Sequence, residues 1–170
     1  MSEAVQQTMT LALPEIVLTA GALALLMFGV FRGERATNLV NGLAVLLLIV
    51  VAVMVGNAAD KAVGFGGSFV VDDFARFLKV LALVGSAAAI LLSLEFLSNL
   101  RERRFEYAVL ILLSTVGMMV MISAGDLIAL YVGLELMSLP LYVVASIDRD
   151  SVRSTEAGLK YFVLGALSSG

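Results

Sequence analysis

The chain has 170 residues, of which 61% are hydrophobic, with a mean hydropathy of +1.03 and a net charge of −3. Soluble domains contain about 45–50% apolar residues, so the composition predicts an integral membrane protein, and the lack of basic excess argues against a nucleic-acid partner. The chain has no cysteine and no histidine. This excludes disulfides, thiolate nucleophiles, cysteine-ligated iron–sulfur clusters, histidine-ligated haem and the usual zinc sites, so we predict no metal or cofactor site in this chain.

Six segments are apolar enough to cross a bilayer, which takes about 20 residues for about 30 Å of hydrocarbon. They are residues 11–31, 39–56, 74–97, 105–123, 127–146 and 153–170. The pattern predicts an all-α polytopic membrane protein with six transmembrane helices, in which residues 1–170 form a single transmembrane domain. The first ten residues are polar and include Glu3, so we expect no cleavable signal peptide. The sixth segment runs to the last residue, so we expect a chain that is incomplete at its C-terminus.

The first segment begins with Pro14 and Glu15. Proline is favoured in the first helical turn, and an acid there interacts with the positive end of the helix dipole. We therefore interpret Glu15 as a helix-start acid near the membrane interface.

The connections between the segments differ in charge. Those on one side carry seven basic residues, and those on the other side carry only Lys61, leaving aside Arg76 and Lys79 at the start of the third segment. The seven are Arg32, Arg35, Arg101, Arg103, Arg104, Arg149 and Arg153. By the positive-inside rule, the arginine-bearing connections face the cytoplasm and the N-terminus faces outward.

The connection over residues 57–73 contains three glycines, followed by β-branched residues, and predicts a short hairpin. Asp72 and Asp73 are expected to cap the third segment. Lys79 lies one and a half turns inside that segment, and we interpret it as a side chain that snorkels outward. Glu95, near the other end, is expected to meet Arg101 or another basic residue.

The fifth segment contains one ionisable residue, Glu135, which lies nine residues after Asp126, or about 13–14 Å at 1.5 Å per residue. A charge at that depth costs roughly 2.5–3.5 kcal/mol on insertion scales, which indicates a functional group. Ser138 shares its face, and Pro140 cannot donate to the carbonyl of Leu136, so the helix beside the acid can hold water for a proton relay. The alternative is a glutamate permanently paired with a cation to hold helices together.

Glu156 and Lys160 lie at i,i+4 spacing in the sixth segment and can form an ion pair. We predict a proton path through Glu135, Lys160 and Glu156, with Ser138, Pro140, Asp126 and Lys79 as secondary candidates. For the pair in the sixth segment, the alternative is an ion pair at the cytoplasmic end that aids insertion. Asp126 fits a helix cap, and could also mark an outer exit of the path.

Two stretches, from Gly125 to Tyr142 and from Glu156 to Gly170, resemble the subunit N family of the bacterial proton-pumping NADH:quinone oxidoreductase, respiratory complex I. The resemblance implies the N-terminal portion of an antiporter-like fold with about 14 helices in inverted repeats. Glu135 matches the family's fifth-helix glutamate, which gates a half-channel. Glu156 and Lys160 match the charged pair of the family's sixth helix.

The resemblance also implies a function: a membrane-arm subunit that moves protons outward, driven by NADH–quinone chemistry in other subunits. NADH, FMN, iron–sulfur clusters and quinone would be held there, and the partners would be the other membrane-arm subunits and the lipid of the bacterial inner membrane. Two alternatives stay open. One is a subunit of a multisubunit cation/proton antiporter or membrane-bound hydrogenase, and the other is a structural bundle that only holds its partners together.

Overall fold

The computed structural model describes residues 9–58, 61–98 and 105–169. Within them, six long helices account for most of the chain, which confirms the predicted all-α class. The helices are α2 (Leu13–Arg32), α3 (Thr37–Gly56), α4 (Asp73–Ser98), α5 (Glu106–Ile122), α6 (Leu127–Ala145) and α7 (Val152–Ser169). Each coincides with one predicted segment to within a few residues at either end.

Four of the described helices are long and apolar enough to cross a membrane: α2, α3, residues 73–94 of α4, and α6. The apolar α5 has 17 residues, just short of a full span, because it ends at Ile122 before the tight turn into α6. In α7 the first half is charged, with Arg153, Glu156 and Lys160 among its residues.

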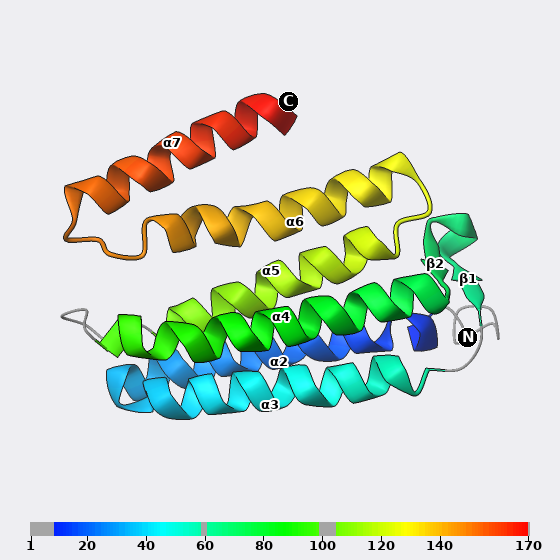
Figure 1. Cartoon of the computed structure of the whole chain (residues 1–170), viewed down its shortest axis with the longest axis horizontal. Coiled ribbons are helices and arrows are strands. Elements are labelled where there is room, and N and C mark those ends of the chain that lie inside the picture. The colour runs from blue at the N-terminus through cyan, green and yellow to red at the C-terminus, as the bar shows by residue number, and fades with distance from the viewer. Residues whose placement is uncertain (1–8, 59–60, 99–104, 170) are drawn as a thin grey trace.

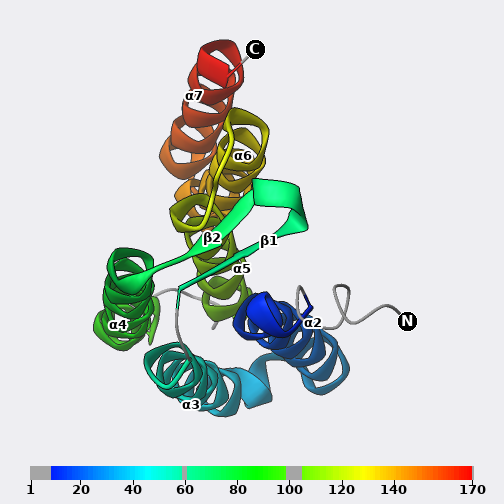
Figure 2. The same ribbon diagram turned by 90° about the vertical axis from the view of Figure 1, so that its right-hand side faces the viewer.

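The helix axes are roughly parallel to one another, and successive helices run in opposite directions (Figure 1). Seen end-on, α2, α3, α4 and α5 form a group, and α6 and α7 extend from α5 in a row to one side (Figure 2). The core lies inside the group of four, where one side of each helix is buried. Its fully buried large side chains include Leu18, Leu48, Leu83, Ile90, Leu112 and Met119.

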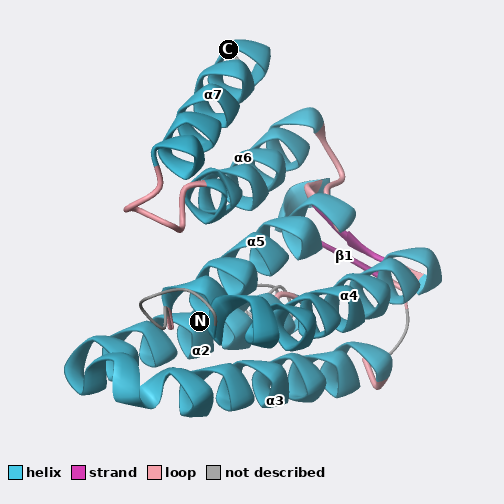
Figure 3. Cartoon of the chain, turned by 60° about the vertical axis from the view of Figure 1, so that its left-hand side comes forward, coloured by secondary structure: helices cyan, strands magenta, loops and turns pink. Residues whose placement is uncertain are grey.

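The predicted hairpin is present, and its two strands close one end of the bundle. Strands β1 (Ala62–Gly64) and β2 (Phe69–Val71) pair antiparallel, with Val63 opposite Val70. The turn between them is the short 3₁₀ helix η2 (Phe65–Gly67), where Gly66 and Gly67 have φ values of 66° and 108°, a region that glycine enters without strain. The hairpin lies across the end of the helices in Figure 2 and beside the end of α4 in Figure 3.

The hairpin is also bonded to the turn between α5 and α6, which the sequence did not predict. The Val70 N–H donates to Ser123 O at 2.8 Å, and the Gly125 N–H donates to Ser68 O at 2.9 Å. Phe69 forms an isolated bridge with Ala124. The turn before α6 thus serves as a third strand-like partner for the hairpin.

Helices α5 and α6 approach each other closely because glycines line their contact. A Cβ atom on Gly117 would lie 2.2 Å from Met137 N, and one on Gly133 would lie 2.6 Å from Met121 N. Such distances leave no space for a larger side chain. Glycine at helix contacts is a common device of membrane proteins, because it lets two backbones pack directly.

Candidate functional site

Helix α6 begins with a complete cap and carries the predicted central acid. Asp126 has extended backbone angles, and its Oδ1 accepts from the Ala129 N–H at 2.7 Å. This bond, together with one from the Ser68 hydroxyl, lowers the pKa of Asp126 below its usual value. The cap that was predicted at Asp126 is therefore confirmed.

Glu135 lies nine residues beyond the cap, or about 13 Å along the helix. Its side chain is half-buried, and its Oε1 is fully buried without a hydrogen-bond partner among the described residues. A buried carboxyl oxygen that lacks a donor is costly, because it has lost its hydrogen bonds to water without gaining others. Glu135 is thus not paired with any cation in the described part of the chain, contrary to the alternative reading of a permanent ion pair within it.

The polar groups next to Glu135 connect to backbone rather than to the acid. Ser138 Oγ donates to Leu134 O at 2.8 Å within α6. Pro140 is buried inside the helix, so Leu136 O lacks its usual helical donor, and on the next residue Met137 O accepts from Ser114 Oγ of α5 at 3.0 Å. Ser114 was not recognised from the sequence, because a serine in an apolar helix gives no sign of which neighbour it faces.

Glu156 and Lys160 form the predicted i,i+4 ion pair, with 2.6 Å between Oε1 and Nζ. Both side chains are exposed, at 56% and 70%. The structure shows no hydrogen bond or ion pair between this pair and Glu135 within the described residues. Glu135 on α6 and the Glu156–Lys160 pair on α7 therefore lie on adjacent helices but do not interact directly among the described residues.

Helix α7 is held against α6 by aromatic contacts and by glycines. The Tyr142 ring meets the rings of Tyr161 and Phe162 edge-on, at centroid distances of 4.8 and 5.7 Å. A Cβ on Gly165 would lie 2.0 Å from Tyr142 Oη, and one on Gly158 would lie 2.5 Å from Ser146 Cβ. These contacts fix α7, and with it Lys160, relative to the helix that carries Glu135.

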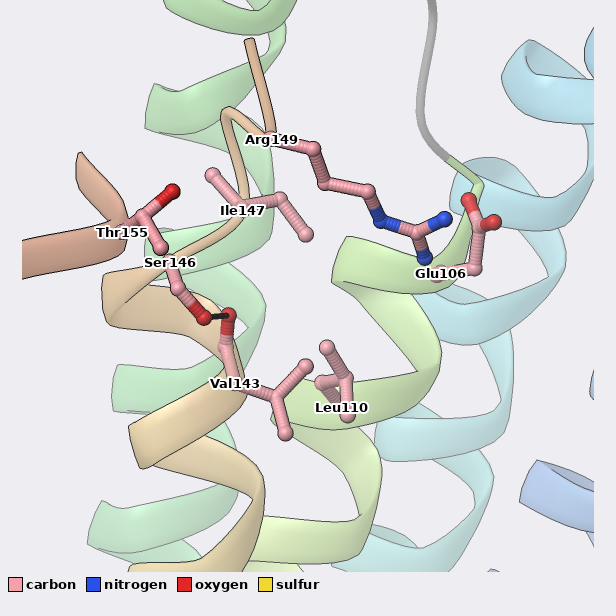
Figure 4. A pocket seen from close by; sticks show the side chains of 7 residues that line it. All are labelled: Glu106, Leu110, Val143, Ser146, Ile147, Arg149 and Thr155. Carbon is pink, nitrogen blue, oxygen red and sulfur yellow. Dashed lines mark hydrogen bonds between the residues drawn. The ribbon is translucent and has the colours of Figure 1, made fainter. Parts of the chain in front are cut away.

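A cavity of about 310 Å³ opens at the end of α6 farthest from the hairpin. Figure 4 shows Arg149 extending from the α6–α7 connection toward Glu106 at the start of α5, above the side chains of Val143 and Leu110. The other lining residues are Ser146, Ile147 and Thr155. This vestibule, lined by both charged and apolar side chains, was not predicted, since its residues are spread over three segments of the sequence.

The interpretation of Lys79 was wrong, because Lys79 does not snorkel outward: its side chain and that of Glu15, 3% and 7% exposed, form an ion pair inside the bundle. Glu15 lies in the first turn of α2, as predicted, but the sequence did not predict its partner. The distance from Lys79 Nζ to Glu15 Oε1 is 2.6 Å, and the other carboxylate oxygen is buried without a hydrogen-bond partner among the described residues. One signal could have indicated the pair: opposite charges lie at similar depth, near the outer ends of two apolar segments.

Asp72 caps α4 as predicted, whereas Asp73 lies in the first turn of the helix and is not a cap. Asp72 Oδ1 accepts from the Ala75 N–H at 2.6 Å, and Asp73 forms an ion pair with Arg76. Arg76 also donates to Ala58 O at 2.6 Å, near the start of the α3–β1 connection. The predicted contact between Glu95 and Arg101 falls outside the described side chains.

Comparison with known proteins gives three matches that agree. Residues 124–170 match the family model for the transmembrane region of the NADH:quinone oxidoreductase/Mrp antiporter proteins. The chain is 57% identical over 159 residues to "NADH-quinone oxidoreductase subunit N" of Azorhizobium caulinodans, an alignment that covers 93% of this chain and 33% of the relative. It is 54% identical over 169 residues to subunit N 1 of Rhizobium meliloti, covering 99% of this chain and 35% of the relative.

The fold also matches a solved structure described as respiratory complex I from Thermus thermophilus with bound aureothin. The TM-score is 0.74 at 29% sequence identity, covering 92% of this chain and 34% of the matched chain. The chain thus spans about a third of the length of the relatives that it matches. The chain is therefore similar over nearly all its length to about a third of subunit N, and its residues 124–170 match the NADH:quinone oxidoreductase/Mrp antiporter family model.

Proposed function

We propose that this chain is part of a membrane-arm subunit of an NADH:quinone oxidoreductase and that it moves protons across the bacterial inner membrane. The observation that carries the proposal is the buried Oε1 of Glu135, which has no donor among the described residues about 13 Å into an apolar helix. A permanently ionised group would be unfavourable there, whereas a carboxyl that binds and releases a proton fits the site. The subunit N relatives support the same assignment.

In this proposal Glu135 carries the proton, and Lys160 with Glu156 forms the charged station on the next helix. Neutralising Glu135 removes a negative charge beside α7 and so changes the electrostatic balance of the Glu156–Lys160 pair. The vestibule between Glu106 and Arg149 provides an opening with charged side chains at one end of α6. The redox groups, NADH, FMN, iron–sulfur clusters and quinone, would belong to other subunits.

The orientation is part of the proposal. Among the described residues, Arg32 and Arg149 lie at the end of the bundle that holds the α2–α3 and α6–α7 connections, and Lys61 lies at the hairpin end (Figure 1). By the positive-inside rule, the hairpin and the start of α2 face outward and the vestibule faces the cytoplasm. Protons would then enter by the vestibule.

The central test is Glu135→Gln in the assembled complex. We expect several-fold slower NADH-driven proton uptake into inverted membrane vesicles, because glutamine keeps the shape of the side chain but cannot carry the proton. Asp148→Asn, which changes a carboxyl in the α6–α7 connection, is the matched control and should retain the normal rate. An unchanged rate and proton stoichiometry in Glu135→Gln, with normal assembly, would contradict the proposal.

The family description also names Mrp antiporters, so a cation/proton antiporter subunit is the second candidate. The two functions differ in what drives the protons. Vesicles that exchange sodium for protons without NADH, and that lack NADH-driven uptake, would favour the antiporter.

A further inference from the structure

The Glu15–Lys79 ion pair joins α2 to α4 at the hairpin end of the bundle. It is buried on both sides, and it connects residues 64 positions apart in the chain. A buried ion pair is a poor source of stability, since apolar residues of similar size often stabilise a protein as well or better. Two charges that are retained at such a place therefore indicate a need for a defined geometry.

The ammonium group of Lys79 has a second neighbour in the hairpin. Its Nζ lies 4.8 Å from the centroid of the Phe69 ring, within the range of a cation–π interaction. Phe69 itself is 8% exposed and lies in β2. Lys79 thus forms an ion pair with Glu15 of α2 and also contacts Phe69 of the hairpin.

The hairpin in turn is bonded to the turn that begins α6. Phe69 pairs with Ala124, and the Ser68 hydroxyl bonds to the carboxylate of Asp126, the residue that caps α6. The hairpin and the α5–α6 turn are closely packed, because a Cβ on Gly125 would lie 2.0 Å from Gly67 O. A continuous set of contacts therefore runs from Glu15 through Lys79, Phe69 and Ser68 to the first turn of the helix that carries Glu135.

We propose that Glu15 and Lys79 are positioning residues: their ion pair holds Phe69 and the β1–β2 hairpin, which fixes the outer end of α6. The consequence for proton movement rests on the proposed function of Glu135. The placement of the hairpin does not rest on it and can be tested separately. A cation at position 79 is the essential feature, because a neutral side chain leaves the Phe69 ring without its partner.

The test compares three variants in the assembled complex in membranes. Lys79→Met removes the cation and leaves Glu15 unpaired. The double variant Glu15→Gln with Lys79→Met removes both charges, so it avoids an unpaired buried carboxylate and should assemble. Lys79→Arg keeps a cation that can both pair with Glu15 and contact Phe69. Arg76→Met, one turn away on α4, is the matched control for loss of a basic residue.

Hairpin placement is measured by the labelling rate of a cysteine introduced at Ala124, the half-buried bridge partner of Phe69, with a membrane-impermeant maleimide. The same label on a cysteine at Val63, which is 64% exposed in the hairpin, corrects for access. We expect several-fold faster labelling at position 124 in the double variant and in Lys79→Met, and unchanged labelling in Lys79→Arg and Arg76→Met. Proton uptake should fall several-fold in the same two variants, with the double variant assembled at the normal level.

A merely stabilising ion pair predicts a different result for the double variant. Labelling that stays at the unsubstituted rate in the double variant would overturn the positioning role, and faster labelling with undiminished proton uptake would overturn its link to Glu135. If Glu135→Gln itself leaves uptake unchanged, the proposed function fails, while the labelling rates still decide where the hairpin is held.

Discussion

At the scale of single residues, the same two chemical groups occur in very different surroundings. The Lys79–Glu15 and Lys160–Glu156 pairs have the same N–O distance of 2.6 Å, but the first is buried and the second is exposed. An exposed pair contributes little to stability, so Lys160 is free to exchange partners. Glu135 stands between these cases, half-buried and unpaired within the described chain. Burial, rather than residue type, separates the residues with a proposed positioning role from those with a proposed role in transport.

For Lys160, we predict that Lys160→Arg retains most proton uptake and that Lys160→Met loses most of it. Arginine keeps the positive charge that responds to Glu135 and can still pair with Glu156, whereas methionine keeps only the apolar stem. The measurement is NADH-driven proton uptake in vesicles with equal amounts of assembled complex. Equal rates in the two variants would show that packing, not charge, is what position 160 supplies.

At the scale of elements, the α5–α6 contact is the tightest helix pairing that surrounds Glu135. Gly117 of α5 lies against the backbone at Met137, and Ser114 bonds to that residue's carbonyl two positions after Glu135. The contact therefore holds the stretch of α6 that contains the acid. Helix α5, though short, contacts α2, α4 and α6 and so lies at the centre of the molecule.

We predict that Gly117→Ala destabilises the protein by about 1–3 kcal/mol, the usual effect of overpacking, because the added Cβ would meet Met137 N at 2.2 Å. Gly42→Ala is the matched control: Gly42 is also helical, but nothing lies within 4 Å of its Cβ position. There alanine should stabilise by about 0.4–1 kcal/mol through the unfolded chain. Thermal inactivation of the purified complex measures both, and a Gly117→Ala variant as stable as Gly42→Ala would contradict the packing.

At the scale of the whole molecule, the sequence predicted the helices, the hairpin and the i,i+4 pair, because each depends on residues close together in the chain. It did not predict the Glu15–Lys79 pair, the docking of the hairpin on the α5–α6 turn, or the vestibule. Those features depend on which helix faces which, and an apolar segment surrounded by lipid carries little of the polar–apolar periodicity that would indicate its inner face. Glu135 could be found because a single charge in a long apolar run stands out whatever its neighbours are.

Orientation is a property of the whole molecule and gives a prediction of its own. A cysteine at Val63 should react with an impermeant maleimide in spheroplasts, and a cysteine at Asp150 should react only in inverted vesicles, because the proposed orientation places the hairpin outside and the α6–α7 connection in the cytoplasm. The absence of native cysteine from these 170 residues keeps their background low. The reverse pattern would place the vestibule on the outer side and would reverse the assigned direction of the path.

The buried ion pair has a consequence for how the protein is made. Glu15 leaves the ribosome 64 residues before Lys79, so α2 enters the membrane while its acid still lacks a counter-charge. An ionisable group exposed to lipid is unfavourable, so we expect α2 to stay beside the insertion machinery until α4 arrives. We therefore expect α2, α3 and α4 to be integrated into the membrane as one three-helix unit.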